Sequence, residues 1–181
     1  MADRELYDAA CFGEGDTLKR LLEEQPEAAK RAPYSPDCAS LLHDAAAAGH
    51  AQVVELLLHY GAPVGAVDDD GQTPLHHSAA EGHLEVLKLL APSPACVELF
   101  VLDKYQMSPY HLACENGHET CVGHLLMLLE RPPPALEPRA AQMRRGSAVF
   151  LAEQAGHTNV LEVIHSSRSS SVDGGQHTVS G

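Results

Sequence analysis

Thr73-Pro74-Leu75-His76-His77-Ser78 belongs to a set of four similar segments that decide the fold of this chain. A glycine and a histidine, Gly82-His83, follow it nine residues after the threonine. The other three segments begin at Ser40, Ser108 and Ser147, and each is followed by Gly-His at the same distance. Successive segments start 33, 35 and 39 residues apart. A local pattern that recurs at such a period indicates a stack of repeated helical units.

The three other segments share the order of residue types with the first. They read Ser40-Leu41-Leu42-His43-Asp44-Ala45, Ser108-Pro109-Tyr110-His111-Leu112-Ala113 and Ser147-Ala148-Val149-Phe150-Leu151-Ala152. Thr-Pro-Leu-His-x-Ala at a period near 33 is the ankyrin-repeat signature, and the chain resembles the ankyrin-repeat family. The resemblance covers about residues 4–166. It implies an all-α solenoid of about five helix-turn-helix repeats with β-turn fingers, over residues 4–34, 35–67, 68–102, 103–141 and 142–166.

The repeat at 68–102 shows the physical basis of the pattern. Thr73 is a good N-cap, and Pro74 suits the first helical position because its φ angle is already helical. Leu75 points to the repeat core, and Gly82 stands where the first helix must end in a left-handed residue. A second helix follows, with an apolar stripe made of Leu84, Val86, Leu87, Leu89 and Leu90.

The same register assigns structural roles in the other repeats. The resemblance implies that the histidines of the signature hydrogen-bond and hold neighbouring turns together. Four further histidines follow the turn glycines, so their spacing also comes from the repeat. The expected structural positions are Leu42, His43, Gly49, Thr73, Pro74, Leu75, His76, Gly82, His111, Gly117 and Gly156.

The two ends of the array depart from the pattern. Residues 4–34 form a weaker copy, which is typical of a terminal repeat that must show one face to water. The last copy has Ala148 in place of proline and Phe150 in place of histidine, so it is either a C-terminal cap or a binding repeat. A polyproline-like insertion is expected at 131–138, and the Ser- and Gly-rich segment 167–181 is expected to be disordered.

Composition excludes several classes of protein. The five cysteines are scattered without a Cys-x-x-Cys pair, which favours reduced thiols over a disulfide framework. The charged start lacks the apolar region of a secretory signal, and no apolar run reaches the length of a membrane span. We therefore expect a cytoplasmic protein, with the nucleus as a second location, that does not bind membranes.

The sequence carries no motif that indicates catalysis or a cofactor. Gly13-Glu14-Gly15 lacks the third glycine and the preceding strand of a dinucleotide-binding loop. Neither the phosphate-binding P-loop pattern nor Gly-x-Ser-x-Gly occurs, and zinc-ligand spacings such as His-Glu-x-x-His are missing. We expect a protein that is not an enzyme, with no catalytic residue, metal or cofactor.

The resemblance implies that a partner protein meets the fingertips and the solvent side of the first helices. Tyr105 and Met107 stand out, since an exposed tyrosine and methionine suit an interface, although packing between fingers is an equal alternative. Met143 is assigned to the same surface by register. The partner-facing positions that we predict are Asp69, Asp70, Gln72, Glu81, Lys104, Tyr105, Met107, Glu115 and Asn116.

The distribution of charge indicates the kind of partner. The net charge is −13, and residues 32–87 hold eight acidic side chains without a lysine or arginine. Such a block repels nucleic acid and favours a basic protein partner, unless it only maintains solubility. Four arginines gather between residues 131 and 145, where they can contact phosphate or an acidic peptide, or pair with the acidic block of another molecule. We expect a monomer that does not bind nucleic acid and that acts as a non-catalytic adaptor or regulator, binding a partner protein through its concave face. The alternative is a substrate-recognition subunit or effector that acts with a separate enzyme.

Overall fold

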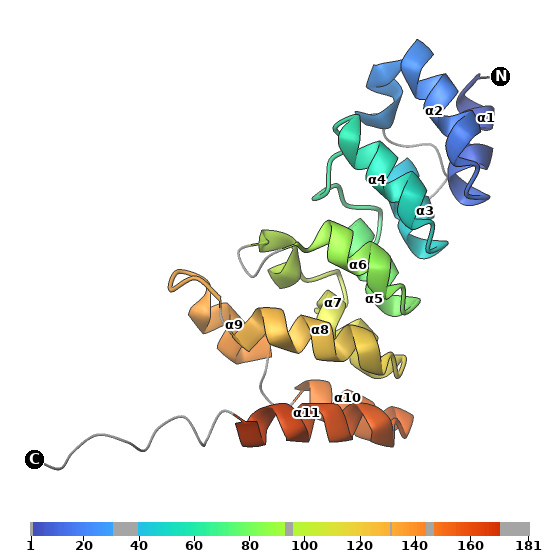
Figure 1. Ribbon diagram of the computed structural model, residues 1–181. Helices are drawn as coiled ribbons and strands as arrows, with labels where there is room; N and C mark the ends of the chain where they lie inside the picture. The colour runs from blue at the N-terminus through green and yellow to red at the C-terminus, as the bar shows by residue number, and fades with distance from the viewer. Residues whose placement is uncertain (1, 31–39, 93–95, 131, 144–146, 171–181) are drawn as a thin grey trace, which may run out of the picture.

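The computed structural model describes residues 2–30, 40–92, 96–130, 132–143 and 147–170. Within these ranges the chain forms helices joined by turns, and there is no strand. The helices follow one another down an elongated stack, with the N-terminal helices at one end and α11 at the other (Figure 1). They are α1 (Ala2–Cys11), α2 (Gly15–Glu24), η1 (Pro26–Lys30), α3 (Leu41–Ala47), α4 (Ala51–His59), α5 (Pro74–Ala80), α6 (Leu84–Leu90), η2 (Val97–Phe100), α7 (Pro109–Glu115), α8 (Glu119–Glu130), α9 (Glu137–Met143), α10 (Ser147–Ala155) and α11 (Thr158–Ser170).

The helices stack in two rows. The first helices of successive repeats, α1, α3, α5, α7 and α10, each contact the next in the row. The second helices, α2, α4, α6, α8 and α11, form a parallel row in the same way. Two rows of helices stacked repeat upon repeat are the predicted solenoid, so the fold prediction is confirmed.

A single apolar cluster runs along the stack between the two rows. Leu42 and Leu75 lie in it with 1 % and 0 % of their surface exposed. Ala45, Ala79 and Ala113 are also buried, and such small side chains let neighbouring first helices approach closely. Because every repeat shares its core with its neighbours, the stability of one repeat depends on the next.

The turn glycines take the conformation that the pattern requires. Gly49, Gly82, Gly117 and Gly156 have φ angles between 76° and 78°, in the left-handed region that L-residues avoid. Each therefore ends its first helix and lets the chain reverse into the second. Gly13 in the weak N-terminal copy has φ 74°, so this copy makes the same turn.

The insertion between the fourth and fifth repeats is not an extended polyproline segment throughout. Residues 134–136 form a turn, and Glu137–Met143 form helix α9, which contacts α8. Pro138 occupies the first turn of α9, where a proline has no helical hydrogen bond to lose. The predicted boundary at residue 142 falls inside this helix, and the first helix of the fifth repeat begins only at Ser147.

The predicted end of the repeat domain at residue 166 is too early. Helix α11 continues to Ser170, so residues 167–170 belong to the last helix and not to the tail. Serine hydroxyls at this end donate back to carbonyls of the preceding turn, as Ser166 does to Val163 at 3.0 Å. The rest of the predicted tail, residues 171–181, lies outside the described part of the chain.

Candidate interaction surface

The histidines of the repeat signature link each repeat to the next. At the start of α5, the backbone N–H of Thr73 donates to Nδ1 of His76 at 3.1 Å, and Nε2 of the same ring bonds to the Met107 carbonyl at 3.2 Å. His43 does the same with Ser40 and the Gln72 carbonyl. Since a carbonyl only accepts, Nε2 of each ring carries a proton, and since a backbone N–H only donates, Nδ1 accepts and carries none. Each ring is therefore neutral.

Burial keeps these rings in the neutral form. It lowers the pKa of His76 to about 4, and it also lowers the pKa values of His43 and His111. His111 differs in its partner, because its Nε2 reaches the Ser147 hydroxyl at 2.8 Å and not the carbonyl of a finger. The signature histidines therefore have structural bonds on both ring nitrogens.

A second row of histidines spans the same junctions at the helical turns. Nε2 of His50, His83, His118 and His157 donates to a carbonyl of the preceding repeat at 2.7–2.9 Å. Each ring lies directly on a turn glycine of that repeat, so closely that a Cβ there would overlap it. The three signature histidines and these four at the turns therefore all hold neighbouring repeats together. In the described part of the chain, no group of three or more His, Cys, Asp or Glu side chains is arranged to hold a metal ion.

The fingers are closed by aspartates. Oδ1 of Asp68 accepts from the N–H groups of Asp70 and Gln72 at 2.9 Å, and Oδ2 lies 2.8 Å from Nε2 of His77. Burial opposes ionisation of Asp68, but the bonds from His77 and the backbone outweigh it and lower the pKa of the carboxyl. Asp103 repeats this arrangement in the next finger, where it accepts from the N–H groups of Tyr105 and Met107.

Two of the predicted partner-facing residues are partly engaged in the fold. Nε2 of Gln72 donates to Oδ2 of Asp103 at 2.9 Å, so this amide joins two neighbouring fingers. Met107 is half-buried, and its carbonyl accepts the bond from His76. The sequence did not predict the bond of Gln72, whereas for Met107 it left packing between fingers open as an alternative to partner binding.

The remaining predicted positions lie at or near the surface. Tyr105 is 64 % exposed, and Nζ of Lys104 lies 5.1 Å from the centroid of its ring. Lys104 also forms an ion pair with Asp70 of the preceding finger, and this bond raises the pKa of the lysine. Asp69, Glu81, Glu115 and Asn116 are exposed. We call Asp70, Lys104 and Tyr105 the fingertip cluster.

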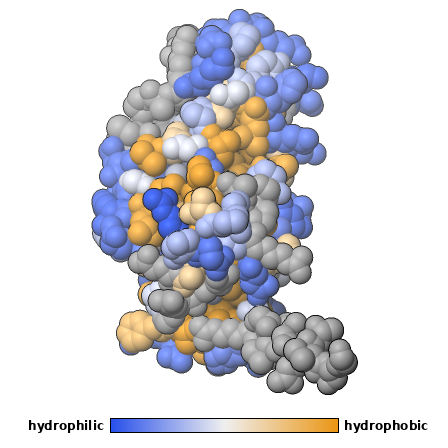
Figure 2. All heavy atoms as spheres, turned by 90° about the vertical axis from the view of Figure 1, so that its left-hand side faces the viewer, coloured by the Kyte–Doolittle hydropathy of each residue, from blue (hydrophilic) through white to orange (hydrophobic). Residues whose placement is uncertain are grey.

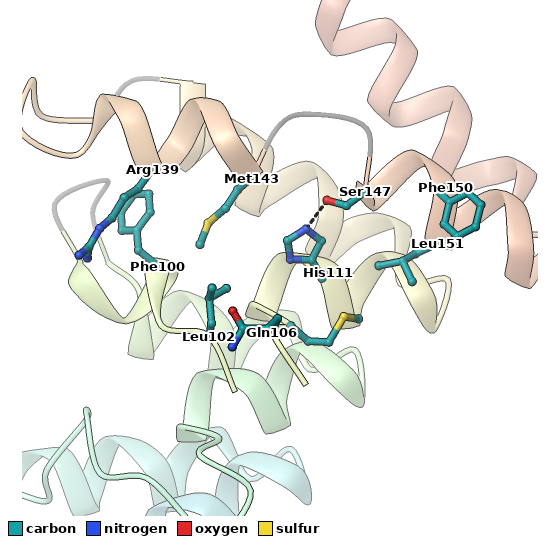
Figure 3. Close-up of a pocket in the computed structure, with 10 residues that line it drawn as sticks. Phe100, Leu102, Gln106, His111, Arg139, Met143, Ser147, Phe150 and Leu151 are labelled. Atoms are coloured by element: carbon teal, nitrogen blue, oxygen red, sulfur yellow. Dashed lines mark hydrogen bonds between the residues drawn. The ribbon is translucent and has the colours of Figure 1, made fainter. Parts of the chain in front are cut away.

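A groove that the sequence did not predict lies beside the fourth finger. It has a volume of about 520 Å³ and is lined by residues of the finger, α7, α9, α10 and the segment after α6 (Figure 3). Met143, assigned by register to the exposed binding surface, is instead 6 % exposed and faces this groove from α9. The repeat pattern gives no signal for the groove, because α9 is an insertion.

Comparison with known proteins identifies the family of this chain. The sequence profile described as ankyrin repeats (3 copies) matches residues 6–100 and also 42–132. The chain therefore belongs to the ankyrin-repeat family. This family membership indicates a protein–protein interaction module.

A curated protein that is similar to part of this chain is the E3 ubiquitin-protein ligase XB3 of Oryza sativa subsp. japonica. The two are 40 % identical over 72 residues. The match covers 40 % of this chain and 16 % of the ligase, so this chain spans only a small part of the length of its relative.

One further finding concerns membranes. Among the described residues, no helix combines the length and the apolar character that crossing a bilayer requires.

Proposed function

We propose that this protein is a non-catalytic adaptor or regulator that binds a partner protein through its fingers and the solvent side of its first helices. The observation that carries the proposal is the fingertip cluster. Tyr105 exposes 64 % of its surface beside the paired charges of Lys104 and Asp70, at the tip of a finger that Asp103 holds in place. An exposed tyrosine on a rigid support is the kind of residue that anchors a protein interface.

The charge of the surface supports a basic partner. Asp69 is exposed on the preceding finger, and the ion pairs of the described residues do not involve it. Asp70 next to it is already paired with Lys104. Asp69 therefore contributes more than Asp70 to the negative electrostatic field that steers a basic partner toward the fingers.

A photo-cross-linking experiment in cells tests the proposed surface. A photoreactive amino acid replaces Tyr105 in one variant and Met127 in the control, which is 58 % exposed on α8 in the other row of helices. We expect a protein to be cross-linked in stoichiometric amount from position 105 and not from position 127. The same cross-linking pattern from both positions would contradict the assignment of the surface.

The captured partner then allows a test of charge steering. We expect Asp69→Asn to slow association severalfold at low salt and to flatten its dependence on ionic strength. Glu55→Gln makes the same change of charge on the exposed side of α4 and is the matched control. Equal effects of the two variants would show that only net charge matters.

A second candidate function is recognition of a substrate for a separate enzyme. The partial similarity to an E3 ubiquitin-protein ligase favours this alternative. A ubiquitination assay on the cross-linked partner distinguishes the two, since only a recognition subunit makes ubiquitin transfer depend on this chain. We further propose a monomer that resides in the cytoplasm, with the nucleus as a second location, which sedimentation and imaging of a tagged protein would test.

A further inference from the structure

The groove beside the fourth finger lies where the chain departs from the repeat pattern, at the inserted helix α9. In the two preceding repeats the finger aspartate stands five residues before the cap, as Asp68 does before Thr73 and Asp103 before Ser108. The corresponding residue before Ser147 is Gln142, which lies in helix α9. His111 bonds to the Ser147 hydroxyl, whereas His43 and His76 bond to finger carbonyls.

Several of the apolar side chains that line the groove are exposed to water. Leu102 and Phe150 line it with 41 % and 57 % of their surface exposed. Phe150 occupies the register position of the signature histidine in the last repeat of the described chain. Apolar side chains gathered in a groove favour an occupant that removes them from water. On the side of the molecule on which α9 lies, orange apolar side chains gather in the upper and middle part of the face, with blue hydrophilic side chains at its edges (Figure 2).

Among the described residues that line this groove, Arg139 alone has a permanently charged side chain, and its charge is opposite in sign to the net charge of the protein. Arg139 projects from α9 near Phe100, while Phe150 and Leu151 lie at the other end of the groove (Figure 3). The ion pairs of the described residues do not involve Arg139, whose side chain is exposed. A guanidinium group forms strong paired hydrogen bonds with a carboxylate. The groove thus has an apolar end and a cationic end.

We propose that this groove binds an extended segment of a partner protein that carries apolar side chains and one acidic side chain. The apolar side chains cover Leu102, Phe150 and Leu151, and the carboxylate pairs with Arg139. An extended segment fits because the two ends of the groove are separated along its length, so that a compact anion reaches only one of them. The proposal rests on the proposed function as a protein-binding module, and it adds a second site with its own specificity.

Short fluorescein-labelled synthetic peptides provide the test, with fluorescence anisotropy as the measurement. Each has a Gly-Ser background with one Phe, one Leu and one Glu at systematically varied spacings, and matched versions carry Gln or Lys in place of Glu. We expect binding at a preferred spacing, with the Glu peptide favoured over the Lys peptide by about three- to tenfold. Phe150→Ala should weaken binding of all versions by about tenfold, as loss of an interface anchor does.

Reversal of the charge at position 139 tests whether Arg139 binds the acidic side chain of the peptide. Arg139→Glu should reverse the preference, so that the Lys peptide binds more tightly than the Glu peptide. Arg20→Glu makes the same change of net charge on exposed α2 and should leave the preference unaltered. Both arginines and Phe150 are exposed, and circular dichroism checks that every variant keeps its helices. An unaltered preference in Arg139→Glu, or no binding by any peptide of the set, overturns the proposal.

Two other occupants would also overturn it. Dimerisation in sedimentation experiments that Phe150→Ala abolishes would identify a second copy of this chain in the groove. Peptide binding that appears only after deletion of residues 171–181 would identify the C-terminal segment of the chain itself. Failure of the proposed function is seen separately, because cross-linking from position 105 reports on the fingertips and not on the groove.

Discussion

Replacement of Gly82 by alanine tests how the repeats are held together. The φ angle of Gly82 is 78°, and a Cβ built there lies 2.8 Å from both Cγ and Cε1 of His118 in the next repeat, and closer still to Nδ1. Alanine therefore introduces backbone strain and also displaces the ring. Displacement breaks the 2.7 Å bond from His118 Nε2 to the Ala80 carbonyl.

Gly156 is the matched control for this change. Its φ angle is also 78°, but a Cβ built there has no heavy atom of the described residues within 4 Å. Gly156→Ala should therefore show the backbone strain alone, about 1–2 kcal/mol. Gly82→Ala adds overpacking of about 1–3 kcal/mol and loss of a hydrogen bond worth about 1 kcal/mol.

The expected difference between the two variants is about 2–4 kcal/mol in the free energy of unfolding. Urea denaturation followed by circular dichroism measures it. His118→Ala combined with Gly82→Ala should remove most of the overlap, so the two changes should be strongly non-additive. Equal destabilisation by Gly82→Ala and Gly156→Ala, or simple additivity with His118→Ala, would refute the role of the ring.

Three further predictions concern stability. The folded state keeps the pKa of His76 at about 4, against 6.5 for the free side chain, so the unfolded chain binds a proton first as the pH falls. The free energy of unfolding should then decrease between pH 6.5 and pH 4, by about 3 kcal/mol from this ring, and His76→Gln should reduce that slope in urea titrations. Leu75→Ala should cost about 2–5 kcal/mol because the side chain is fully buried, and an unchanged melting curve would contradict the register. Gln106 has φ 63°, in the left-handed region, where the preceding finger has Gly71. Because glycine adopts this conformation without strain, Gln106→Gly should raise the free energy of unfolding by up to about 1 kcal/mol. A lower melting temperature of this variant would contradict the prediction.

The sequence alone determined the repeat fold and the residues that build it. Thr73, Pro74, Leu75 and Gly82 act through local physics, since capping, a preset φ angle, burial and a left-handed turn are encoded within one helix-turn-helix unit. The same unit recurs, so each copy supports the interpretation of the others. The linking role of His76 was also accessible, because the resemblance to the family implied that role.

The tertiary structure decided what depends on contacts between unlike segments. Gln72 and Asp70 appeared equally available in sequence, yet one bonds to Asp103 and the other pairs with Lys104 in the next finger. Each of these contacts joins two residues more than thirty positions apart. Neither residue of either pair is part of the repeat signature, so the signature does not predict that they meet.

The groove is the clearest example of a feature that the sequence pattern does not predict. Its lining comes from Phe100 after α6, Arg139 in the inserted helix α9 and Phe150 in α10. The inserted helix is not part of the repeat pattern. The sequence pattern identified the insertion at 131–138 and its arginines, but it did not predict helix α9, which begins at Glu137. Periodicity reports the units that repeat, whereas a binding groove arises here where the repeat is interrupted, and only the packing of the interruption shows its shape.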